Sequence, residues 1–389
     1  MTGTESQSRA QVIAAGHICL DIILQMQVSE FSFRPGTLQA IGPPVVSLGG
    51  CVSNTGLALK KLGAVVHLVG KIGADPIGDL LRLELQKFGD AAEGLTRSSQ
   101  ENTSYSVIIS PHGADRMILH FSGTNDSFTA NDVDSALLRP AEIFHFGYPP
   151  LMRRMFEDEG RELEEVFRRA KQKKFLTSLD MAYPDPNSPA GRVNWRAIAA
   201  RVLPQVDIFL AAYEEVAYML EPDSWRRHAQ VSATNLRRVA ETACNMGAAV
   251  VAIKLGNRGL YLRTSDQARL SQDCRLSSED WVNRELWAPV FKVNVVGTTG
   301  AGDATVAGFL YGILRRFPVE QVCRIACAVG ACNIEAADAV SGILPFELLE
   351  RRMREGWNQE PCPESWPAIA PGVFAGPNDR KRVTDGSSR

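Results

Sequence analysis

A segment of small residues, VGTTGAGD at 296–303, joins a glycine-rich loop to a carboxylate. Apolar residues at helical spacing follow it and end at two arginines, which predicts that the loop opens a helix near Asp303. The N–H groups of a first helical turn have no partner inside the helix and therefore bind anions. An anion hole with the Asp303 carboxylate beside it as a base is what phosphoryl transfer to a hydroxyl requires. An aspartate that only caps the helix is the alternative.

A second glycine cluster, Gly49-Gly50, precedes Asn54 and a helix expected over 55–62. Paired glycines allow a ligand to approach the backbone closely, and the Asn54 amide donates and accepts hydrogen bonds. Asp21 follows the first expected strand and His145 ends another, and such strand ends face the ligand crevice of an open α/β sheet. These positions predict a site for a hydroxyl-bearing ligand. The alternatives are a turn with an asparagine cap, a surface aspartate, and a core or surface role for His145.

Two common nucleotide-binding motifs are absent from the sequence. Gly70-Lys71 is followed by Ile72, so no GxxxxGK[ST] occurs. The glycines at 297, 300 and 302 do not form GxGxxG, and they lie late in the chain. The sequence therefore supports neither a Walker-type NTPase nor a simple dinucleotide dehydrogenase.

The composition narrows the classes further. The chain has 389 residues with 42 Lys+Arg against 44 Asp+Glu, a formal net charge of −2, which argues against a nucleic-acid partner. No apolar run approaches the roughly 18 residues of a membrane span, and the N-terminus lacks the apolar region of a signal peptide. The eight cysteines show no metal spacing, and Cys323 and Cys327 are expected to be buried on a helix. Free thiols without a secretion signal predict a cytoplasmic location.

Strand-like and helix-like segments alternate along most of the chain, which predicts an α/β fold with a mainly parallel sheet covered on both faces. Helical periodicity is clear over 55–62 and 77–88, and short apolar runs predict strands at 12–15, 64–69, 142–146, 175–179, 207–211 and 248–255. The segments at about 21–47 and 104–121 instead alternate polar and apolar residues. They predict a small antiparallel sheet that projects from the core as a lid over a ligand.

One large domain is therefore expected to span residues 11–356, with the lid included. Residues 1–10 and 357–389 are expected to be disordered tails. The first is polar, and the second contains five prolines and ends in RKRVTDGSSR. Such segments bury too little apolar surface to offset the entropy lost on ordering.

Taken in order, these motifs resemble those of the ribokinase/PfkB family of carbohydrate kinases. Residues 49–54 are similar to the family's GG-x-x-x-N, and 297–303 to its D-T-T-G-A-G-D. Residues 73–78 (GADPIG), 121–125 (FSGTN) and 254–259 (KLGNRG) resemble its G-x-D-x-x-G, G-A-N and K-x-G-x-x-G segments. The resemblance covers about residues 11–350. It implies a ribokinase-like fold, in which a three-layer α/β/α core carries a small β-sheet lid.

The resemblance also implies roles for individual residues. Asp303 would be the base that takes the proton of the sugar hydroxymethyl group, and N–H groups for the transferred phosphate would come from Gly300, Ala301 and Gly302. The sugar hydroxyls would be held by Asp21, Gly49, Gly50, Asn54 and Asn125. ATP would lie near Lys254, Gly256, Gly259 and Thr298. Mg²⁺ would bind the ATP phosphates, with Glu215 as an indirect ligand through water.

Three positions depart from the family pattern. Gly297 replaces the first Asp of D-T-T-G-A-G-D, a residue associated with a monovalent-cation site, so the resemblance does not extend to potassium activation. The family's N-x-x-E keeps Glu215 but has Ala212 in place of the Asn, and its D-x-N-x-R keeps only Asp180. Because Asp303 and its loop are intact, an active enzyme is favoured.

The sequence therefore predicts an ATP-dependent kinase that phosphorylates a primary hydroxyl of a small sugar or sugar derivative. Its partners would be this sugar and ATP. Two alternatives stay open: a nucleoside kinase of the same fold, and a sugar- or nucleotide-sensing homologue with weakened catalysis. Lids of this kind often pair through their exposed faces, which predicts a homodimer.

Overall fold

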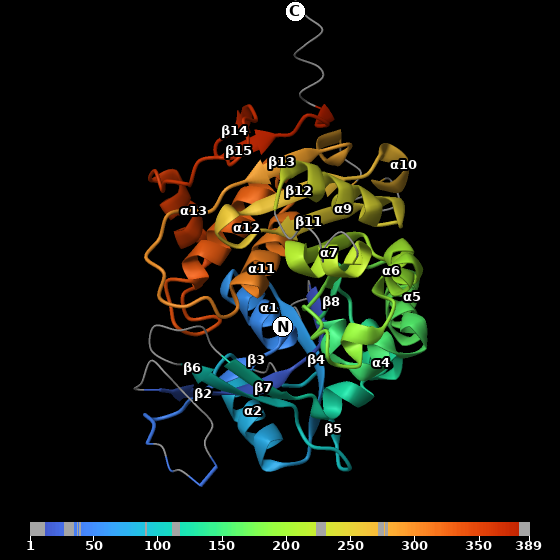
Figure 1. Cartoon of the computed structure of the whole chain (residues 1–389), viewed down its shortest axis with the longest axis vertical. Coiled ribbons are helices and arrows are strands. Elements are labelled where there is room, and N and C mark those ends of the chain that lie inside the picture. The colour runs from blue at the N-terminus through green and yellow to red at the C-terminus, as the bar shows by residue number, and fades with distance from the viewer. Residues whose placement is uncertain are drawn as a thin grey trace, which may run out of the picture.

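A computed structural model of the chain describes residues 12–26, 35–36, 38, 40–89, 92–110, 117–222, 231–270, 276 and 279–380. The expected tail at 1–10 and the chain end at 381–389 lie outside these ranges. The described residues form a large sheet of 11 strands and a separate sheet of four strands, which lies at the lower left of Figure 1. The predicted α/β fold with a small lid sheet is confirmed.

Seven neighbouring strands of the large sheet run parallel. Across the sheet they are β5 Leu95–Ser98, β4 Val66–Gly73, β1 Val12–Gly16, β8 Ile143–Gly147, β9 Leu176–Asp180, β10 Ile208–Ala212 and β11 Val250–Lys254. Short apolar runs build them because both faces of the sheet are covered, and β1, β8 and β9 are buried along their whole length. Each of the six strands predicted from apolar runs corresponds to one of these, and β5 is an addition.

The other edge of the large sheet is antiparallel. Beyond β11 follow β12 Leu260–Thr264, β13 Glu285–Ala288, β15 Val373–Ala375 and β14 Ala368–Ala370. The last two strands belong to the segment that was predicted as a disordered tail, so that prediction is wrong for 357–380. Pro371 and Gly372 form the turn between the two strands, with Gly372 at a φ of 66°. Pro371 thus lies in the turn of a short hairpin at the edge of the sheet, where a proline does not interrupt strand pairing.

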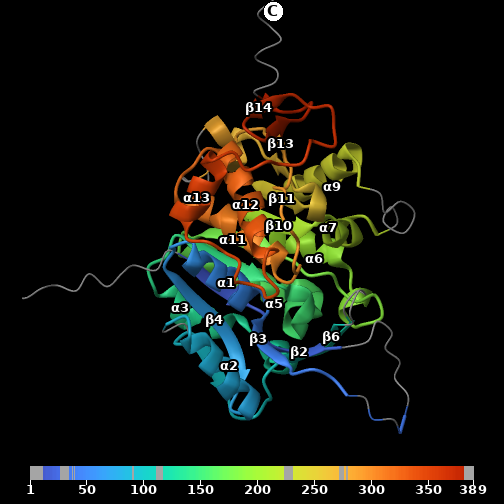
Figure 2. The same cartoon turned by 90° about the vertical axis from the view of Figure 1, so that its left-hand side faces the viewer.

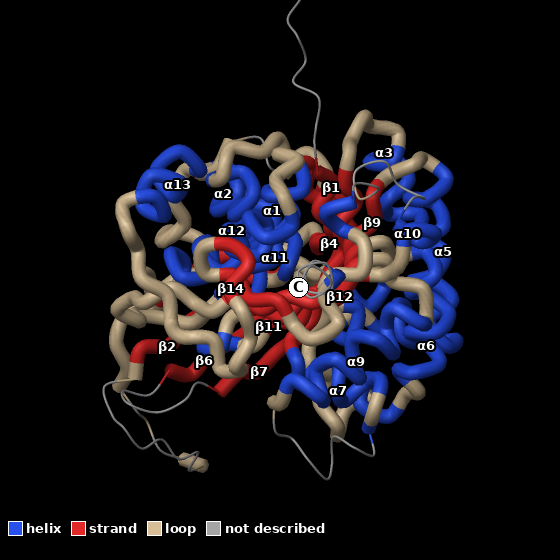
Figure 3. Tube along the Cα trace, turned by 90° about the horizontal axis from the view of Figure 1, so that it is seen from above, coloured by secondary structure: helices blue, strands red, loops and turns tan. Residues whose placement is uncertain are grey.

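Helices cover both faces of the large sheet, as the view in Figure 3 shows. One layer contains α1 Cys51–Lys61, α11 Ala301–Leu314, α12 Val319–Asn333 and α13 Phe346–Arg354. The other contains α5 Arg161–Gln172, α6 Trp195–Val202, α7 Tyr213–Leu220 and α9 Ala233–Asn245. The predicted helices at 55–62 and 77–88 correspond to α1 and to α2 Pro76–Gln86, and shorter helices are α3 Asp134–Leu137, α4 Arg153–Phe156 and α10 Gln267–Leu270.

Side chains alternate between the two helical layers along each central strand. Ile208 of β10 packs against the layer with α11, whereas Phe209 packs against the layer with α5. Cys323 and Cys327 are buried on α12, as predicted. Among the described helices, none combines the length and the apolar character that a membrane crossing requires.

The four-stranded sheet is the predicted lid. Its strands are β3 Val45–Gly49, β2 Cys19–Gln25, β6 Tyr105–Ser110 and β7 Met117–Phe121, in this order, and they lie apart from the large sheet (Figure 2). The sheet is not purely antiparallel as expected, because β2 and β6 pair in parallel. The chain between these two strands passes through α1, β4, α2 and β5, which is a connection long enough for a parallel crossover.

A buried ion-pair cluster holds the end of the described chain against β13. Arg284 is fully buried, and its guanidinium donates to Asp379 at 2.9 Å and to Glu320 at 2.8 Å. Asp379, also fully buried, accepts the N–H of Glu285 at 2.9 Å. Arg284 and Asp379 are both shielded from water, so separating them would leave a buried charge without a partner. The ion pair therefore holds the last described residues against the core.

We expect Asp379→Ala to lower the free energy of unfolding by about 3 kcal/mol, because the buried Arg284 guanidinium loses one of its two counter-ions. Urea denaturation measures the change. The matched control is Glu355→Ala, which removes an exposed carboxylate from the same part of the chain and should cost less than about 0.5 kcal/mol. Equal effects of the two substitutions would contradict the docking of the C-terminal segment.

Candidate active site

The loop before α11 enters the helix through a left-handed turn. Gly300 is the N-cap with a φ of 72°, and a Cβ there would lie 2.6 Å from the Cβ of Ala339. Only glycine fits this position without strain. Asp303 lies in the first helical turn, as predicted. The N–H of Ala301 donates to the Thr298 carbonyl at 3.3 Å, so Ala301 is a weaker candidate for the anion hole than the glycines on either side of it.

The Asp303 carboxylate is buried, and side chains from two other parts of the chain bind it. From α1, Asn54 Nδ2 donates to Oδ2 at 3.0 Å, and Thr55 Oγ1 donates to Oδ1 at 3.1 Å. The hydroxyl of Tyr148, in the turn after β8, lies 2.8 Å from both carboxylate oxygens. Sequence reasoning missed Thr55 and Tyr148. The position of Tyr148 directly after a buried strand was the signal that could have found it.

The surroundings make Asp303 a stronger base than an exposed aspartate. Burial raises the pKa of its carboxyl group, while Lys254 and the hydrogen bonds from Asn54, Tyr148 and Thr55 oppose that rise. Burial and the negative charge of Asp303 raise the pKa of Tyr148, which keeps its hydroxyl protonated as a donor. A carboxylate with a raised pKa, held in one orientation, suits proton abstraction from a hydroxyl.

Lys254 lies at the end of β11 among carboxylates. Its Nζ is 2.6 Å from Oδ1 of Asp180, which ends β9, and 3.5 Å from the position that a Cβ on Gly302 would have. Burial by itself would lower the pKa of Lys254, but the surrounding carboxylates outweigh burial and raise it, so the ammonium group stays charged. Burial raises the pKa of Asp180 to about 6 and that of Glu215 to about 7, although Lys254 opposes both shifts.

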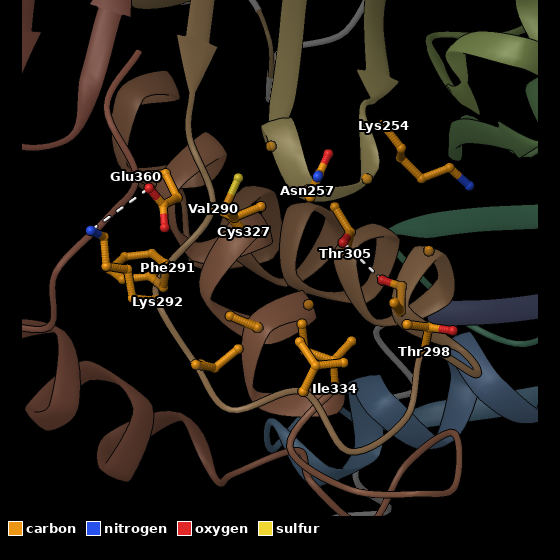
Figure 4. A pocket seen from close by; sticks show the side chains of 18 residues that line it. Lys254, Asn257, Val290, Phe291, Lys292, Thr298, Thr305, Cys327, Ile334 and Glu360 are labelled. Carbon is orange, nitrogen blue, oxygen red and sulfur yellow. Dashed lines mark hydrogen bonds and ion pairs between the residues drawn. The ribbon is translucent and has the colours of Figure 1, made fainter. Parts of the chain in front are cut away.

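A cavity of about 650 Å³ opens beside Lys254 and the first turn of α11 (Figure 4). The four residues predicted for the nucleotide all line it, namely Lys254, Gly256, Gly259 and Thr298. Much of the remaining wall is apolar and comes from Val290, Phe291, Val293, Cys327, Ala331 and Ile334. The volume is typical of small-molecule sites. A charged end and an apolar remainder suit a ligand with an anionic part and a flat apolar part.

Asp21, Gly49 and Gly50 meet where the lid joins the core. The carboxylate of Asp21 on β2 lies over Gly49 on β3, where any Cβ would clash with it. Nearby, His17 after β1 and His120 on β7 approach each other, with 3.2 Å between their Nε2 atoms. This contact joins core and lid, and sequence reasoning missed it because 103 positions separate the two histidines.

Two other residues that the sequence suggested bind protein groups. Asn125 is fully buried; its Nδ2 donates to the Ile18 carbonyl at 2.9 Å, and its Oδ1 accepts the Ile18 N–H at 3.2 Å. These bonds fix the backbone near the site and use two of the four hydrogen-bonding positions of the amide, so the contact of Asn125 with a sugar stays a prediction. His145 is also fully buried, with Nδ1 3.0 Å from Oγ of Ser178, so it does not reach the crevice.

The comparison with known proteins decides the family. Residues 9–345 match the pfkB family of carbohydrate kinases. The chain belongs to this family. Among curated relatives, an uncharacterized sugar kinase of Archaeoglobus fulgidus is 25% identical over 74% of this chain and 98% of its own length. Fructokinase-2 of Oryza sativa is 25% identical over 78% of this chain and 80% of its own.

The fold is also that of solved ribokinases. The structure of Arabidopsis thaliana ribokinase complexed with ribose and ATP superimposes with a TM-score of 0.69, covering 88% of this chain and 98% of that one at 17% identity. This PfkB protein is therefore a carbohydrate kinase with a ribokinase-like core.

The loop at Gly297 has no room for the aspartate that the family associates with its monovalent cation. A Cβ there would lie 2.9 Å from the carbonyl oxygen of Ala336 and 3.0 Å from Ala337, so the backbone after α12 occupies the space that an aspartate side chain needs. The loop at Gly297 can lie this close to Ala336 and Ala337 because glycine replaces the larger aspartate of the family. Whether potassium activates this chain stays a prediction.

The site suits Mg²⁺ that is held through its water molecules, not by direct protein ligands. Oδ2 of Asp180 is buried without a hydrogen-bond partner, and Glu215 belongs to the same charge cluster. Glu215 also accepts the N–H of Ala212 at 2.6 Å, which caps α7 without the family's Asn. Within the described ranges, no three His, Cys, Asp or Glu side chains are arranged to hold a metal ion directly. Carboxylates that bind the water shell of an ion suit Mg²⁺, which gives up its water reluctantly.

We expect protonation of His145 to destabilise the fold as the pH falls. Burial, with a smaller contribution from Lys254, lowers the pKa of His145 to about 3, so the folded state keeps it neutral where the unfolded state binds a proton. The free energy of unfolding of the wild type relative to His145→Asn should fall by roughly 1.4 kcal/mol per pH unit between pH 6 and 4. Denaturant titrations at several pH values measure it. A difference that does not change with pH would mean that His145 titrates freely in the fold.

Proposed function

We propose that this PfkB kinase transfers the γ-phosphoryl group of ATP to a primary hydroxyl of a small sugar or sugar derivative. The observation that carries the proposal is the position of the Asp303 carboxylate. It lies in the first turn of α11, beside Lys254 and the cavity on one side and beside Asn54 of the glycine cluster on the other. A base between an anion hole and an acceptor site is the arrangement that in-line phosphoryl transfer needs.

The hydrogen bonds of Asp303 leave room for one more donor. A carboxylate has about four acceptor positions, and three donors occupy it: Asn54, Thr55 and the shared Tyr148 hydroxyl. The acceptor hydroxyl takes the fourth position and gives its proton to Asp303 as its oxygen attacks the γ-phosphorus. The bond between that phosphorus and the β,γ-bridging oxygen breaks, and ADP leaves with the electron pair. Because the three donors fix the carboxylate, the base does not reorient during the reaction.

Backbone N–H groups and the ammonium group of Lys254 would bind the phosphates of ATP. The N–H groups of Gly300 and Gly302 would bind the transferred phosphoryl group, and Gly302, Lys254 and Thr298 line the cavity. Mg²⁺ would bind the ATP phosphates and neutralise their charge, with Asp180 and Glu215 holding its water shell. Binding of the phosphates by local N–H groups, without a basic surface, is compatible with the net charge of −2 of this chain.

The acceptor lies under the lid, where Asp21, Gly49, Gly50 and Asn54 offer polar groups to its hydroxyls. His17 and His120 add two further ring nitrogens at the same junction, one from the core and one from the lid. No arginine or lysine is among these residues, which favours a neutral sugar. The ribokinase structure with bound ribose and ATP and the fructokinase relative support a sugar of this size.

We expect Asp303→Asn to lower kcat/KM about 10³-fold, because the amide cannot accept the hydroxyl proton. ADP release is measured with ATP and a panel of sugars, sugar phosphates and nucleosides. The matched control is Asp79→Asn, because Asp79 also lies in the first turn of a helix, α2. The kcat/KM of this variant should stay within twofold of that of the wild type.

The results of this assay separate the alternatives. Acceptor-dependent turnover that survives Asp303→Asn would refute Asp303 as the base. Faster turnover of a nucleoside than of any sugar would show that the protein is a nucleoside kinase. Saturable sugar binding without turnover would favour the sensing homologue. A rate that requires potassium would show that the loop at Gly297 opens to admit the cation.

We also propose that two copies of the chain pair through their lids. β7 is the last strand of the lid sheet, and all five of its residues are exposed, including Met117, Ile118, Leu119 and Phe121 at 43–51%. An apolar edge strand with unpaired backbone groups is a template for pairing with a second chain. Such pairing would bury the apolar side chains that the single chain leaves in water.

We expect the double substitution Ile118→Lys/Leu119→Lys to convert the dimer into a monomer, because lysines on an edge strand oppose strand pairing. Light scattering after size exclusion measures the molar mass. Leu83→Lys, at an exposed leucine on α2, should leave the dimer intact. A wild-type protein that elutes as a monomer at micromolar concentration would refute the proposal.

A further inference from the structure

The segment that follows the family match builds part of the cavity wall. The match ends at residue 345, and residues 357–360 then run antiparallel to 290–292. The N–H of Lys292 donates to the Asn358 carbonyl at 2.9 Å, and the N–H of Glu360 donates to the Val290 carbonyl at 2.8 Å. Residues 290–293 line the cavity, so the C-terminal segment supports this wall from behind.

Aromatic packing fixes the two segments against each other. Trp357 lies on Phe291, with 4.3 Å between ring centroids, and the Arg352 guanidinium covers Trp357 at 3.8 Å from the ring centroid. The side chain of Gln359 donates to the Pro289 carbonyl at 2.8 Å. These contacts and the two backbone hydrogen bonds fix the backbone at Glu360 against the wall of the cavity.

Glu360 is a charged residue at the far end of this cavity. Figure 4 shows Glu360 and Lys292 together on the opposite side of the pocket from Lys254 and Thr298. Under the proposed function, on which this inference rests, the phosphates bind near Lys254 and Thr298. The nucleobase then extends along the apolar wall toward Glu360.

The ion pair of Glu360 leaves its carboxylate available to a ligand. Lys292 Nζ lies 3.7 Å from Oε2, and the two side chains are 55% and 47% exposed. An ion pair so open to water contributes little stability, and one amine occupies only part of the acceptor capacity of a carboxylate. Apolar walls bind the faces of any base, so the edge of the base is identified by the polar groups at the end of the cavity.

We propose that Glu360 is a specificity-determining residue for the phosphoryl donor. Its carboxylate accepts a hydrogen bond from the exocyclic amine of adenine, and Lys292 lies beside the carboxylate. The base is thus recognised by a residue that the chain supplies after the family match has ended. A donor without the exocyclic amine leaves the carboxylate without this partner and binds more weakly.

The test compares the binding of ATP and of purine riboside 5′-triphosphate, which lacks the exocyclic amine, by calorimetry with Mg²⁺. We expect the wild type to prefer ATP by about tenfold, as one charge-assisted hydrogen bond at a partly exposed site predicts. In Glu360→Ala the preference should fall to within about twofold, and Glu360→Gln, which keeps a weaker acceptor, should be intermediate. The control Glu355→Ala removes a carboxylate that does not line the cavity and should keep the full preference.

Each result bears on the proposal. Loss of the preference in Glu360→Ala with unchanged affinity for purine riboside triphosphate supports it. An equal preference in wild type and Glu360→Ala refutes it while leaving ATP as the donor. If the wild type binds neither nucleotide, the proposed function fails, and this inference fails with it.

Discussion

The burial of one carboxylate, that of Asp303, is the constraint on which the rest of the site depends. A buried carboxylate is costly unless hydrogen bonds and opposite charge compensate it. Here the compensation comes from Asn54 and Thr55 on α1, from Tyr148 after β8, and from the nearby charge of Lys254 at the end of β11. These groups come from both halves of the sequence. The site therefore exists only when α1, the central strands and α11 are assembled.

The parallel sheet explains why these groups converge. The strands β8, β9, β10 and β11 are neighbours, so their carboxyl ends lie along one edge of the sheet. Tyr148 follows β8, Asp180 ends β9 and Lys254 ends β11. Buried strands hold these positions rigidly, since they are packed between two layers of helices. The one ammonium group of Lys254 thus lies among the carboxylates of Asp180, Glu215 and Asp303 and offsets part of the cost of burying them.

Much of the fold, including the loop that opens α11, was predictable from local sequence. Short apolar runs predict the central strands because both faces of a parallel sheet are buried, and each run corresponds to a strand. The loop at 297–303 predicts the first turn of α11 because glycine conformations and helix geometry are local properties. The antiparallel edge was less predictable. β14 and β15 are three residues long, and the prolines near them resemble those of a disordered tail.

The sequence by itself determined the family, the central strands and the presence of an aspartate in the first turn of a helix, because these depend on motifs, composition and residues close together in the chain. Only the tertiary structure decided which side chains bind the carboxylate of Asp303 and which bind other protein groups. Tyr148 and Thr55 were missed as partners of Asp303, and Asn125 turned out to bind the backbone at Ile18. Hydrogen bonds between residues more than a hundred positions apart depend on how elements pack. No local pattern encodes them.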